Sequence, residues 1–296
     1  MTAGPPRFDV GVVGVGRAGS VLAAALDRAG HRVVAAHAVS ELSRLRAESM
    51  LPHAALTDVV DVVARVDLVL LTVPDDVLPG LIESLAEGGH LRPGVILVHA
   101  SGRYGVAVCE PATRRGALPL ALHPVMTLTG TSLDLDRLSG CPFGVTSDPA
   151  LRPMAEALVV EMGGEPVWVQ ESNRGLYHAA LANASNHVVA LTVQSMDLLS
   201  MAGVADPGKM LGPLMTASLD NALQRGDEAL TGPVMRGDAR TVAEHLRVLS
   251  ELSGHTRDSY QAMARLTADR AIAAGLLTAQ RAEALLDVLT SREERP

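Results

Sequence analysis

The chain has 296 residues, of which 48% are hydrophobic and 20% are charged, so it can bury a large core and form two domains. Its formal net charge is -8 with no run of Lys or Arg, which argues against nucleic-acid or anionic-membrane partners. No apolar run approaches the ~18 residues of a membrane span. An ordinary soluble globular protein of the cytoplasm is therefore expected.

The cysteines and the single lysine limit the chemistry further. Cys109 and Cys141 are the only cysteines, without Cys-x-x-Cys or metal-ligand spacing, so we expect a reducing compartment and no metal site. The start, MTAGPPRFD, is a poor signal peptide. Lys209 is the single lysine, and the last six residues, SREERP, are expected to be a solvated tail.

Strand and helix patterns alternate over the first part of the chain. A β-branched run at Phe8–Val13 is followed by GVGRAGS, by a helical stretch at Ser20–Ala29 and by a strand at His31–Ala36. Further strands are expected at 67–73, 95–99, 118–122, 143–146 and 166–169, and helices at 77–87 and 149–161. Continuous apolar runs such as DLVLLTV are typical of parallel strands buried on both faces. The pattern predicts an α/β domain, Rossmann-like and doubly wound with a parallel sheet, over residues 1–170.

The character of the sequence changes after Glu171. Long segments rich in Ala, Leu and Met follow, without strand runs, and Pro-Gly or Gly-Pro pairs at 207–208, 212–213 and 232–233 interrupt them. We predict an all-helical second domain over residues 171–296, with about six helices. The first and longest helix contains LYHAALANASNHVVAL.

A GxGxxG pattern lies between the first strand and the first helix. Its residues are Gly14, Gly16, Arg17, Ala18 and Gly19. Glycines in this position let the backbone approach a pyrophosphate, whose charge is met by N–H groups at the helix N-terminus. The pattern predicts a dinucleotide site, and a Gly-rich turn needed only for packing is the alternative.

The end of the second strand favours NADPH over NADH. NAD-preferring sites place an acidic residue there, whereas this chain has His37 and Ser40, with Arg44 and Arg46 just beyond. No carboxylate at the strand end would repel a 2′-phosphate, and arginine is within reach. Glu41 speaks against this interpretation, and the arginines could be the polar face of the next helix.

Two further strand ends complete the expected cofactor pocket. Val73 and Pro74 follow one strand, and Ala100 and Ser101 follow the next. Ligands of open α/β sheets bind at the carboxyl ends of the strands. The alternative is that Pro74 and the following Gly102 only turn the chain.

The long helix of the second part carries polar residues on one face. At about 100° per residue, Ser185 lies about 20° and Asn186 about 80° from His178, while Asn183 is flanking and His187 points away. A buried polar side chain costs roughly 1–3 kcal/mol without a partner. We expect this face to line a cleft; capping of neighbouring helices, or hydrogen bonds across a helical core, would be the structural alternative.

The whole chain resembles proteins with a Rossmann-like N-terminal domain and a DUF2520 C-terminal domain. The matching segments are GVGRAG, LLTVPDDVL, VHASGRYG, ALHPVMTLTG, YHAALANASNHVVAL and ALTGPVMRGDARTVAEHL. The resemblance implies membership of the 6-phosphogluconate dehydrogenase-like group. Some members of the family are ketopantoate reductases of the PanG type, which make pantoate for vitamin B5 synthesis with NADPH, although its members differ in activity.

The resemblance also suggests catalytic residues. Better-known relatives use a lysine at the head of the interdomain helix, and here that position is His178, whereas Lys209 lies in a Pro-Gly loop. His178 is therefore expected to donate the proton or polarise the carbonyl, with Asn186 as a hydrogen-bond donor to the substrate. His123 is the rival, although its His-Pro pair could be only a rigid turn; an ordered water is a third possibility.

The substrate's carboxylate needs partners as well. Ser101, Asn183, Ser185 and Arg236 are the candidates, one of them contributed by the second subunit of a homodimer. Arg236 could instead hold a loop in which Asp238 caps the next helix.

Taken together, the sequence predicts an NADPH-dependent reductase of a small-molecule 2-oxoacid, with ketopantoate as the expected substrate and a homodimer formed through the helical domain. Two alternatives stay open. One is reduction of an imine, as in pyrroline-5-carboxylate reductases, and the other is a non-catalytic NADP-binding sensor.

Overall fold

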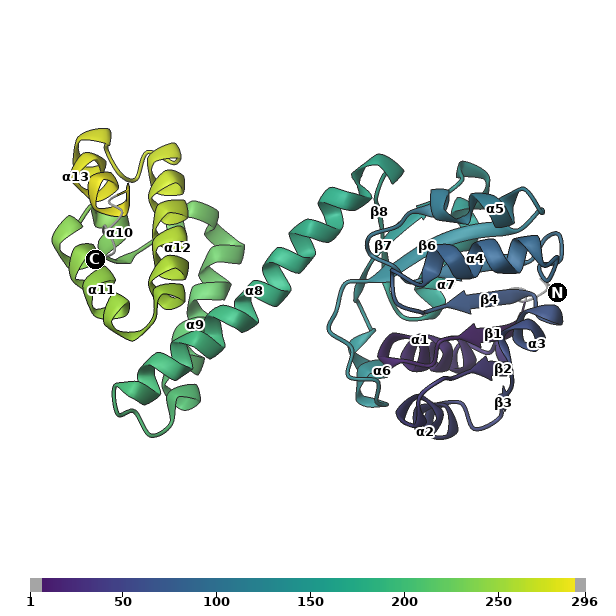
Figure 1. Cartoon of the computed structure of the whole chain (residues 1–296). Coiled ribbons are helices and arrows are strands. Elements are labelled where there is room, and N and C mark those ends of the chain that lie inside the picture. The colour runs from purple at the N-terminus through teal and green to yellow at the C-terminus, as the bar shows by residue number, and fades with distance from the viewer. Residues whose placement is uncertain (1–6, 291–296) are drawn as a thin grey trace. The chain divides into compact units, whose positions relative to one another are not determined.

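The computed structural model describes residues 7–290, so the expected solvated tail at 291–296 lies outside the described residues. The chain divides into two compact units, Met1–Ser185 and Asn186–Pro296. The division falls inside the long helix α8 (Arg174–Met201), whereas the sequence places it at residue 170, before this helix begins. Figure 1 draws both units, and each has a hydrophobic core of its own.

The first unit is built on one eight-stranded sheet with the order β3-β2-β1-β4-β5-β6-β7-β8. The strands are β1 (Asp9–Val13), β2 (Arg32–His37), β3 (Ala55–Leu56), β4 (Leu68–Leu71), β5 (Ile96–His99), β6 (Leu118–Pro124), β7 (Pro142–Ser147) and β8 (Glu165–Trp168). The helices of this unit that precede α8 are α1 (Arg17–Arg28), α2 (Glu41–Met50), α3 (Val59–Ala64), α4 (Leu78–Glu87), α5 (Glu110–Thr113), α6 (Leu133–Arg137) and α7 (Arg152–Glu161). This architecture confirms the predicted Rossmann-like α/β domain.

Strand β4 explains why continuous apolar runs form the centre of the sheet. Leu68 and Leu70 belong to the core that contains residues of α1 and α7, whereas Val69 and Leu71 belong to the core that contains residues of α3 and α4. Successive side chains of a strand point to opposite faces. A run such as LVLL therefore packs against both helical layers (Figure 1).

Two strands depart from the fully parallel sheet that the sequence suggests. β7 pairs antiparallel with β6, and β8 then runs parallel to β7. The connection from β6 to β7 contains only the short helix α6, not a full crossover helix, so the chain returns along the neighbouring strand in the opposite direction. This reversal places His123 of β6 opposite Gly144 of β7.

The chain from residue 174 onward is helical as far as it is described, as predicted. Its α-helices are α8, α9 (Pro207–Arg225), α10 (Gly232–Arg236), α11 (Ala239–Leu252), α12 (Gly254–Ala273) and α13 (Ala279–Thr290). At 28 residues, α8 is the longest. The core of the second unit comes from α10 to α13 and includes Val242, Ala268 and Leu285.

Two details of α9 differ from the sequence-based expectation. The Gly212-Pro213 pair does not interrupt it, because the helix continues through Pro213, although proline cannot donate a backbone hydrogen bond. Lys209 lies in the first turn of α9 and not in a loop, since Pro207 begins the helix and the Asp206 side chain accepts the Lys209 N–H.

None of the helices between residues 7 and 290 combines the length and the apolar character that crossing a membrane would require.

Candidate active site

The carboxyl ends of β1, β4, β5 and β6 lie at one edge of the sheet, because these strands are parallel. The segments that follow them contain the glycine motif after β1, Thr72 after β4 and Ala100 after β5, and His123 lies near the end of β6. Open α/β sheets bind their ligands at this edge. The ends of these four strands therefore define the place where a ligand is expected.

The structure excludes a side chain at two of the three glycines of the motif. Gly14 has φ +97°, and a Cβ there would lie 2.9 Å from the carbonyl oxygen of Thr72. A Cβ on Gly19 would collide with the carbonyl oxygen of Gly14, which also accepts a hydrogen bond from the Thr72 hydroxyl at 2.6 Å. A Cβ on Gly16 would meet no atom within 4 Å. Packing thus explains Gly14 and Gly19, whereas Gly16 faces open space.

The start of α1 fits an anionic group. Gly16 is its N-cap and, within the described residues, no side chain caps this end of the helix. The unbonded N–H groups of the first turn, which comprises Arg17, Ala18 and Gly19, and the positive end of the helix dipole attract phosphate. Gly130 in the segment after β6 packs against Arg17, because its Cβ would lie 3.0 Å from the Arg17 Cα atom.

Replacing Gly16 by alanine is expected to weaken NADPH binding about tenfold or more, because the new methyl group would occupy the space through which a pyrophosphate approaches the helix. The free energy of unfolding should stay within about 0.5 kcal/mol of the wild-type value. Calorimetric titration and urea unfolding measure the two quantities.

Gly80→Ala is the matched control, since Gly80 lies in α4 and its Cβ would also meet nothing within 4 Å. Equal NADPH affinity in the Gly16→Ala and Gly80→Ala variants would contradict a pyrophosphate site at α1.

The end of β2 carries no carboxylate. The His37 ring is 3.0 Å from the carbonyl oxygen of Thr57, and the Ser40 hydroxyl caps α2 by accepting the N–H of Ser43 at 3.1 Å. Arg44 is exposed and reaches the carbonyl oxygen of Ala38 only through its Nε, at 3.4 Å. The hydroxyl of Ser40 is thus occupied by capping, whereas most of the Arg44 guanidinium remains available.

The loop after β5 is held by its own polar groups. The Ser101 hydroxyl accepts the backbone N–H groups of Arg103 and Tyr104 at 3.2 and 3.1 Å. The buried His99 ring lies 2.9 Å from the carbonyl oxygen of Gly105 through Nε2, and burial lowers the pKa of His99 to about 4. Ser101 therefore shapes the loop as well as bordering the site. Val73 and Pro74, after β4, are half-buried and exposed, respectively.

Gly102 brings two histidines together. A Cβ at this position would lie 2.9 Å from Nε2 of His123 and 3.0 Å from Cδ2 of His178. The two rings come from β6 and α8, and both are half-buried. The two histidines that the sequence analysis proposes as alternative proton donors are thus neighbours in the first unit. Only a residue without a side chain fits beside both rings.

Arg174, in the first turn of α8, fixes the helix to the sheet. Its side chain is 2% exposed. It donates to the Thr146 hydroxyl (2.8 Å) and to the carbonyl oxygens of Gly144 (3.0 Å), Ala121 (3.2 Å) and Ser101 (3.5 Å). Burial lowers the pKa of Arg174. The guanidinium thus joins β6, β7 and the loop after β5 to the helix that carries His178.

The neighbouring aromatic residue of α8 contacts one of the histidines. The Tyr177 hydroxyl lies 2.8 Å from Nδ1 of His123, and the rings meet edge to face with centroids 5.7 Å apart. Burial lowers the pKa of His123 to about 4, and the charge of Arg174 acts in the same direction. His123 is therefore neutral at neutral pH.

Arg174, Tyr177 and Glu171 are the residues of this region that our sequence analysis missed. The Glu171 carboxylate accepts the backbone N–H groups of Val106 and Ala107 at 2.7 and 3.3 Å. The spacing of Arg174, Tyr177 and His178 is i, i+3 and i+4, which places all three on one side of the helix. This spacing is the signal in the sequence that could have identified Arg174 and Tyr177 as neighbours of His178.

The remaining predicted residues are not brought to the two histidines by the described contacts. Asn183 and Ser185 are exposed on α8 within the first unit, and Asn186 and Arg236 are exposed residues of the second unit. Asp238 caps α11, accepting the N–H and the hydroxyl of Thr241 at 3.1 and 2.7 Å.

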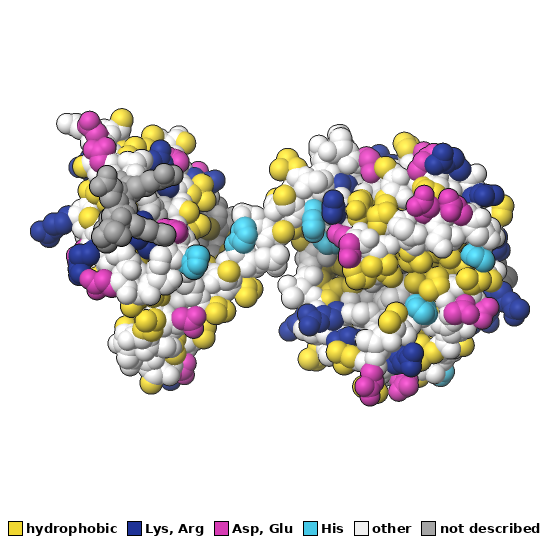
Figure 2. All heavy atoms as spheres, viewed as in Figure 1, with side chains coloured by type: hydrophobic (Ala, Val, Ile, Leu, Met, Phe, Trp, Pro, Cys, Tyr) yellow, Lys and Arg dark blue, Asp and Glu magenta, His cyan; other side chains and the backbone are white. Residues whose placement is uncertain are grey.

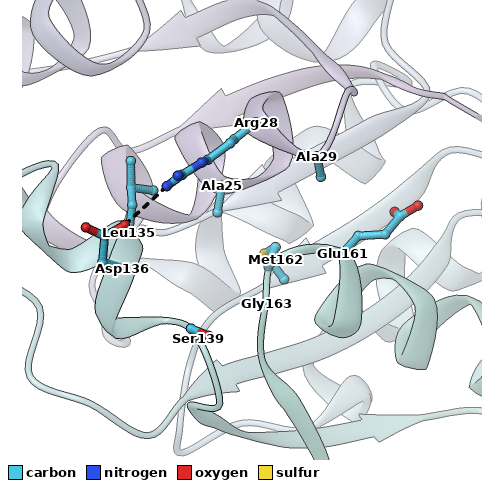
Figure 3. Close-up of a pocket in the computed structure, with 9 residues that line it drawn as sticks. All are labelled: Ala25, Arg28, Ala29, Leu135, Asp136, Ser139, Glu161, Met162 and Gly163. Atoms are coloured by element: carbon cyan, nitrogen blue, oxygen red, sulfur yellow. Dashed lines mark hydrogen bonds and ion pairs between the residues drawn. The ribbon is translucent and has the colours of Figure 1, made fainter.

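A groove of about 410 Å³ lies elsewhere in the first unit (Figure 3). It is bordered by the C-terminal end of α1, by α6 and by the turn after α7, and Arg28 crosses it toward Asp136 at 3.4 Å. The C-terminal end of α1 is about 18 Å from its N-terminus. The groove therefore does not belong to the ligand edge of the sheet.

The two cysteines are free and buried, and burial raises the pKa of Cys109 to about 12. Over residues 7–290, no three His, Cys, Asp or Glu side chains are grouped closely enough to hold a metal ion.

Two domain families match the chain. The Rossmann-like domain covers residues 2–124, and the domain of unknown function DUF2520 covers residues 141–267. The chain thus contains a Rossmann-like domain followed by a DUF2520 domain. No curated protein sequence matches it significantly.

Solved structures share the fold over most of the chain. A Bacteroides fragilis protein named as an NADP oxidoreductase is 20% identical, with a TM-score of 0.76 over 89% of this chain and 98% of that one. The Thermotoga maritima protein TM1727 is 23% identical, with a TM-score of 0.64 over 90% and 99%. An imine reductase of Myxococcus stipitatus in complex with NADP+ is 17% identical, with a TM-score of 0.64 over 96% and 100%. At these identities the likeness establishes the fold.

Proposed function

We propose that the protein is an NADPH-dependent reductase of a 2-oxoacid, and that the substrate is ketopantoate, which it converts to pantoate. The observation that carries this proposal is the meeting of His123 and His178 at Gly102, on the sheet edge that also holds the glycine motif. Carbonyl reduction needs a hydride source beside a proton donor. This edge of the sheet provides a place for both.

The dinucleotide would be held by the backbone of Gly14, Gly16 and Gly19 and by the start of α1, with Val73, Pro74, Ala100 and Ser101 at the neighbouring strand ends. When bound, NADPH supplies the hydride. NADPH is preferred to NADH because β2 ends without a carboxylate and the exposed Arg44 follows it. Complexes of similar folds with NADP+ support this choice.

His178 is the proposed proton donor. As hydride reaches the carbonyl carbon, protonated His178 gives its proton to the oxygen, and solvent reprotonates the ring. His178 suits this role better than His123, because His123 is held neutral by its surroundings. Asn186, two turns along the same helix, is proposed as a hydrogen-bond donor to the substrate.

Ser101, Asn183, Ser185 and Arg236 stay the candidates for binding the substrate's carboxylate. Residues 1–170 are proposed as the NADP-binding domain and residues 171–296 as the substrate and dimerisation domain.

A second candidate reaction is the reduction of an imine, of the kind catalysed by pyrroline-5-carboxylate reductases. It is supported by the fold shared with an imine reductase. An imine is already readily protonated, so it needs less from a donor such as His178. A non-catalytic NADP-binding sensor is the third candidate.

The absorbance of NADPH in the presence of purified protein and ketopantoate tests these proposals, with NADH and pyrroline-5-carboxylate assayed in parallel. Rapid oxidation of NADPH by ketopantoate alone is expected. Oxidation by pyrroline-5-carboxylate alone would favour the imine reductase. No oxidation with either substrate, despite measurable NADPH binding, would favour the sensor.

The helical domain is proposed to form a homodimer. Helix α9 has no buried residue in the chain by itself, and Leu214 and Leu223 are 63% and 78% exposed. Val189 of α8 is 60% exposed, and hydrophobic side chains are visible on this part of the second unit in Figure 2. Extended apolar surfaces of this kind mark protein interfaces.

Sedimentation equilibrium should therefore give the mass of two chains, and the double substitution Leu214→Glu and Leu223→Glu should give the mass of one. Leu133→Glu is the control, because Leu133 is 69% exposed in the first unit. A wild-type protein with the mass of a single chain would refute the homodimer.

A further inference from the structure

The phenol of Tyr177 lies against two paired strands. His123 of β6 and Gly144 of β7 are directly opposite each other in the antiparallel register. The Tyr177 hydroxyl lies against both, since it is 2.8 Å from Nδ1 of His123 and would collide with a Cβ on Gly144. Glycine at position 144 is thus required for the phenol to reach the histidine.

The hydrogen bond between the phenol and His123 bears on where the proton of the ring lies. Burial raises the pKa of Tyr177, and the charge of Arg174 opposes this shift. Because a neutral phenol is a stronger donor than a neutral imidazole N–H, the phenol proton is directed to Nδ1 of His123, at 2.8 Å. A neutral imidazole that accepts at Nδ1 carries its own proton on Nε2.

The Nε2 atom of His123 faces the other histidine of the site. It is the ring atom nearest to the space that a side chain at Gly102 would fill, and His178 borders the same space. Within residues 7–290, the hydrogen bonds of His123 include no partner for Nε2. With its proton on Nε2, His123 thus carries a donor of fixed direction that has no partner among the described residues.

Burial is the main reason that the ring of His123 stays neutral, and the charges around it have a smaller effect. Arg174 and His178 of α8 both disfavour a positive charge on it, whereas Asp75, in the segment after β4, favours one. His99 of β5 is another neighbour, and the pKa of His99, which burial lowers to about 4, leaves it uncharged as well. The phenol of Tyr177 adds to this preference because its hydrogen bond is made to the neutral ring.

We propose that His123 is a fixed neutral donor whose Nε2–H hydrogen-bonds the oxygen that becomes the hydroxyl group of the product, and that Tyr177 is the positioning residue that selects this tautomer. The identity of that oxygen rests on the proposed function. His123 and His178 then have separate roles, since His178 transfers a proton and His123 stabilises the negative charge that develops on the oxygen.

The tautomer can be measured without any substrate. Long-range ¹H–¹⁵N correlation spectra of the full-length protein labelled at its histidines distinguish the tautomers, and the His123→Leu variant assigns the signal. We expect a single Nε2–H tautomer that does not titrate between about pH 5.5 and 8. In Tyr177→Phe the pKa of His123 should rise, because a hydrogen bond to the neutral ring is lost.

Tyr260→Phe is the matched control. The Tyr260 hydroxyl lies 2.7 Å from Nδ1 of His245 in the second unit, and those rings also meet edge to face, at 84°. Both substitutions break a Tyr–His pair of the same geometry, but Tyr260 is not part of the site. A Nδ1–H tautomer of His123 in the wild type, or its titration near pH 6.5, would overturn the proposal.

The role of His123 as a hydrogen-bond donor is tested by measuring kcat. Removing one donor to a developing oxyanion costs about 10²–10³ in kcat, so His123→Leu should lose that much while binding NADPH normally. Tyr177→Phe should lower kcat about tenfold and add an ionisation to its pH profile, whereas Tyr260→Phe should keep the wild-type profile.

Full kcat in His123→Leu would overturn the donor role. If the spectra show the expected tautomer but the protein reduces no 2-oxoacid, the proposed function is overturned, and so is the assignment of the oxygen that Nε2–H binds. The link between Tyr177 and the tautomer of His123 would then still stand.

Discussion

Replacing Arg174 by methionine is expected to lower the free energy of unfolding of the first unit by about 3–5 kcal/mol. Its guanidinium is buried and donates to three carbonyl oxygens and the Thr146 hydroxyl. Methionine fills a similar volume but leaves these acceptors without their donor in a buried place. Urea unfolding followed by the fluorescence of Trp168, the single tryptophan, reports on this unit.

Arg114→Met is the control for this measurement. Arg114 pairs with Glu110 at 3.7 Å on the surface, where the two side chains are 71% and 61% exposed. Exposed pairs contribute about 0–1 kcal/mol. If both substitutions lowered the free energy of unfolding equally, the buried guanidinium would not be what fixes α8 to the sheet.

Replacing His178 by alanine is expected to lower kcat for 2-oxoacid reduction by about 10²–10⁴, because the reaction loses its proton donor. NADPH affinity should be unchanged, since the glycine motif and the start of α1 are on other elements. Stopped-flow measurement of hydride transfer, together with NADPH titration, separates the two effects.

His53→Ala controls for the loss of a histidine, because His53 is an exposed residue of the first unit. It should retain wild-type kcat. Wild-type kcat in His178→Ala, with intact NADPH binding in both variants, would remove His178 from the mechanism.

The strand, turn and helix of the glycine motif could be predicted from the sequence because their signals are local. Gly14 and Gly19 are required by backbone geometry and close packing within this one segment, and the GxGxxG spacing records that geometry directly. The buried runs of β4 and β5 likewise predict their own strands. The predicted Rossmann-like domain followed by helices is confirmed for the same reason.

The region around His123 and His178 depends on contacts that no local pattern records. Nothing in the sequence around Arg174 shows that its partners lie on β6 and β7, at a separation of up to 53 residues. The antiparallel pairing of β7 with β6 places Gly144 opposite His123, beside the phenol of Tyr177, and short apolar runs do not encode strand direction. Of the predicted helix face, His178 lies beside His123, whereas Ser185 is exposed, and the partners of Arg174 and Tyr177 required the fold.

The most direct test of the central claim is transfer of deuterium from NADPH. Ketopantoate is incubated with the protein and NADPH that carries deuterium at C4 of the nicotinamide. One reaction uses deuterium on one face of the nicotinamide ring and a second reaction uses deuterium on the other face. The product is analysed by mass spectrometry and NMR. The account predicts pantoate with one deuterium at the carbon that bore the carbonyl, from one face only. Oxidation of NADPH without deuterium in pantoate, or no pantoate at all, would contradict it.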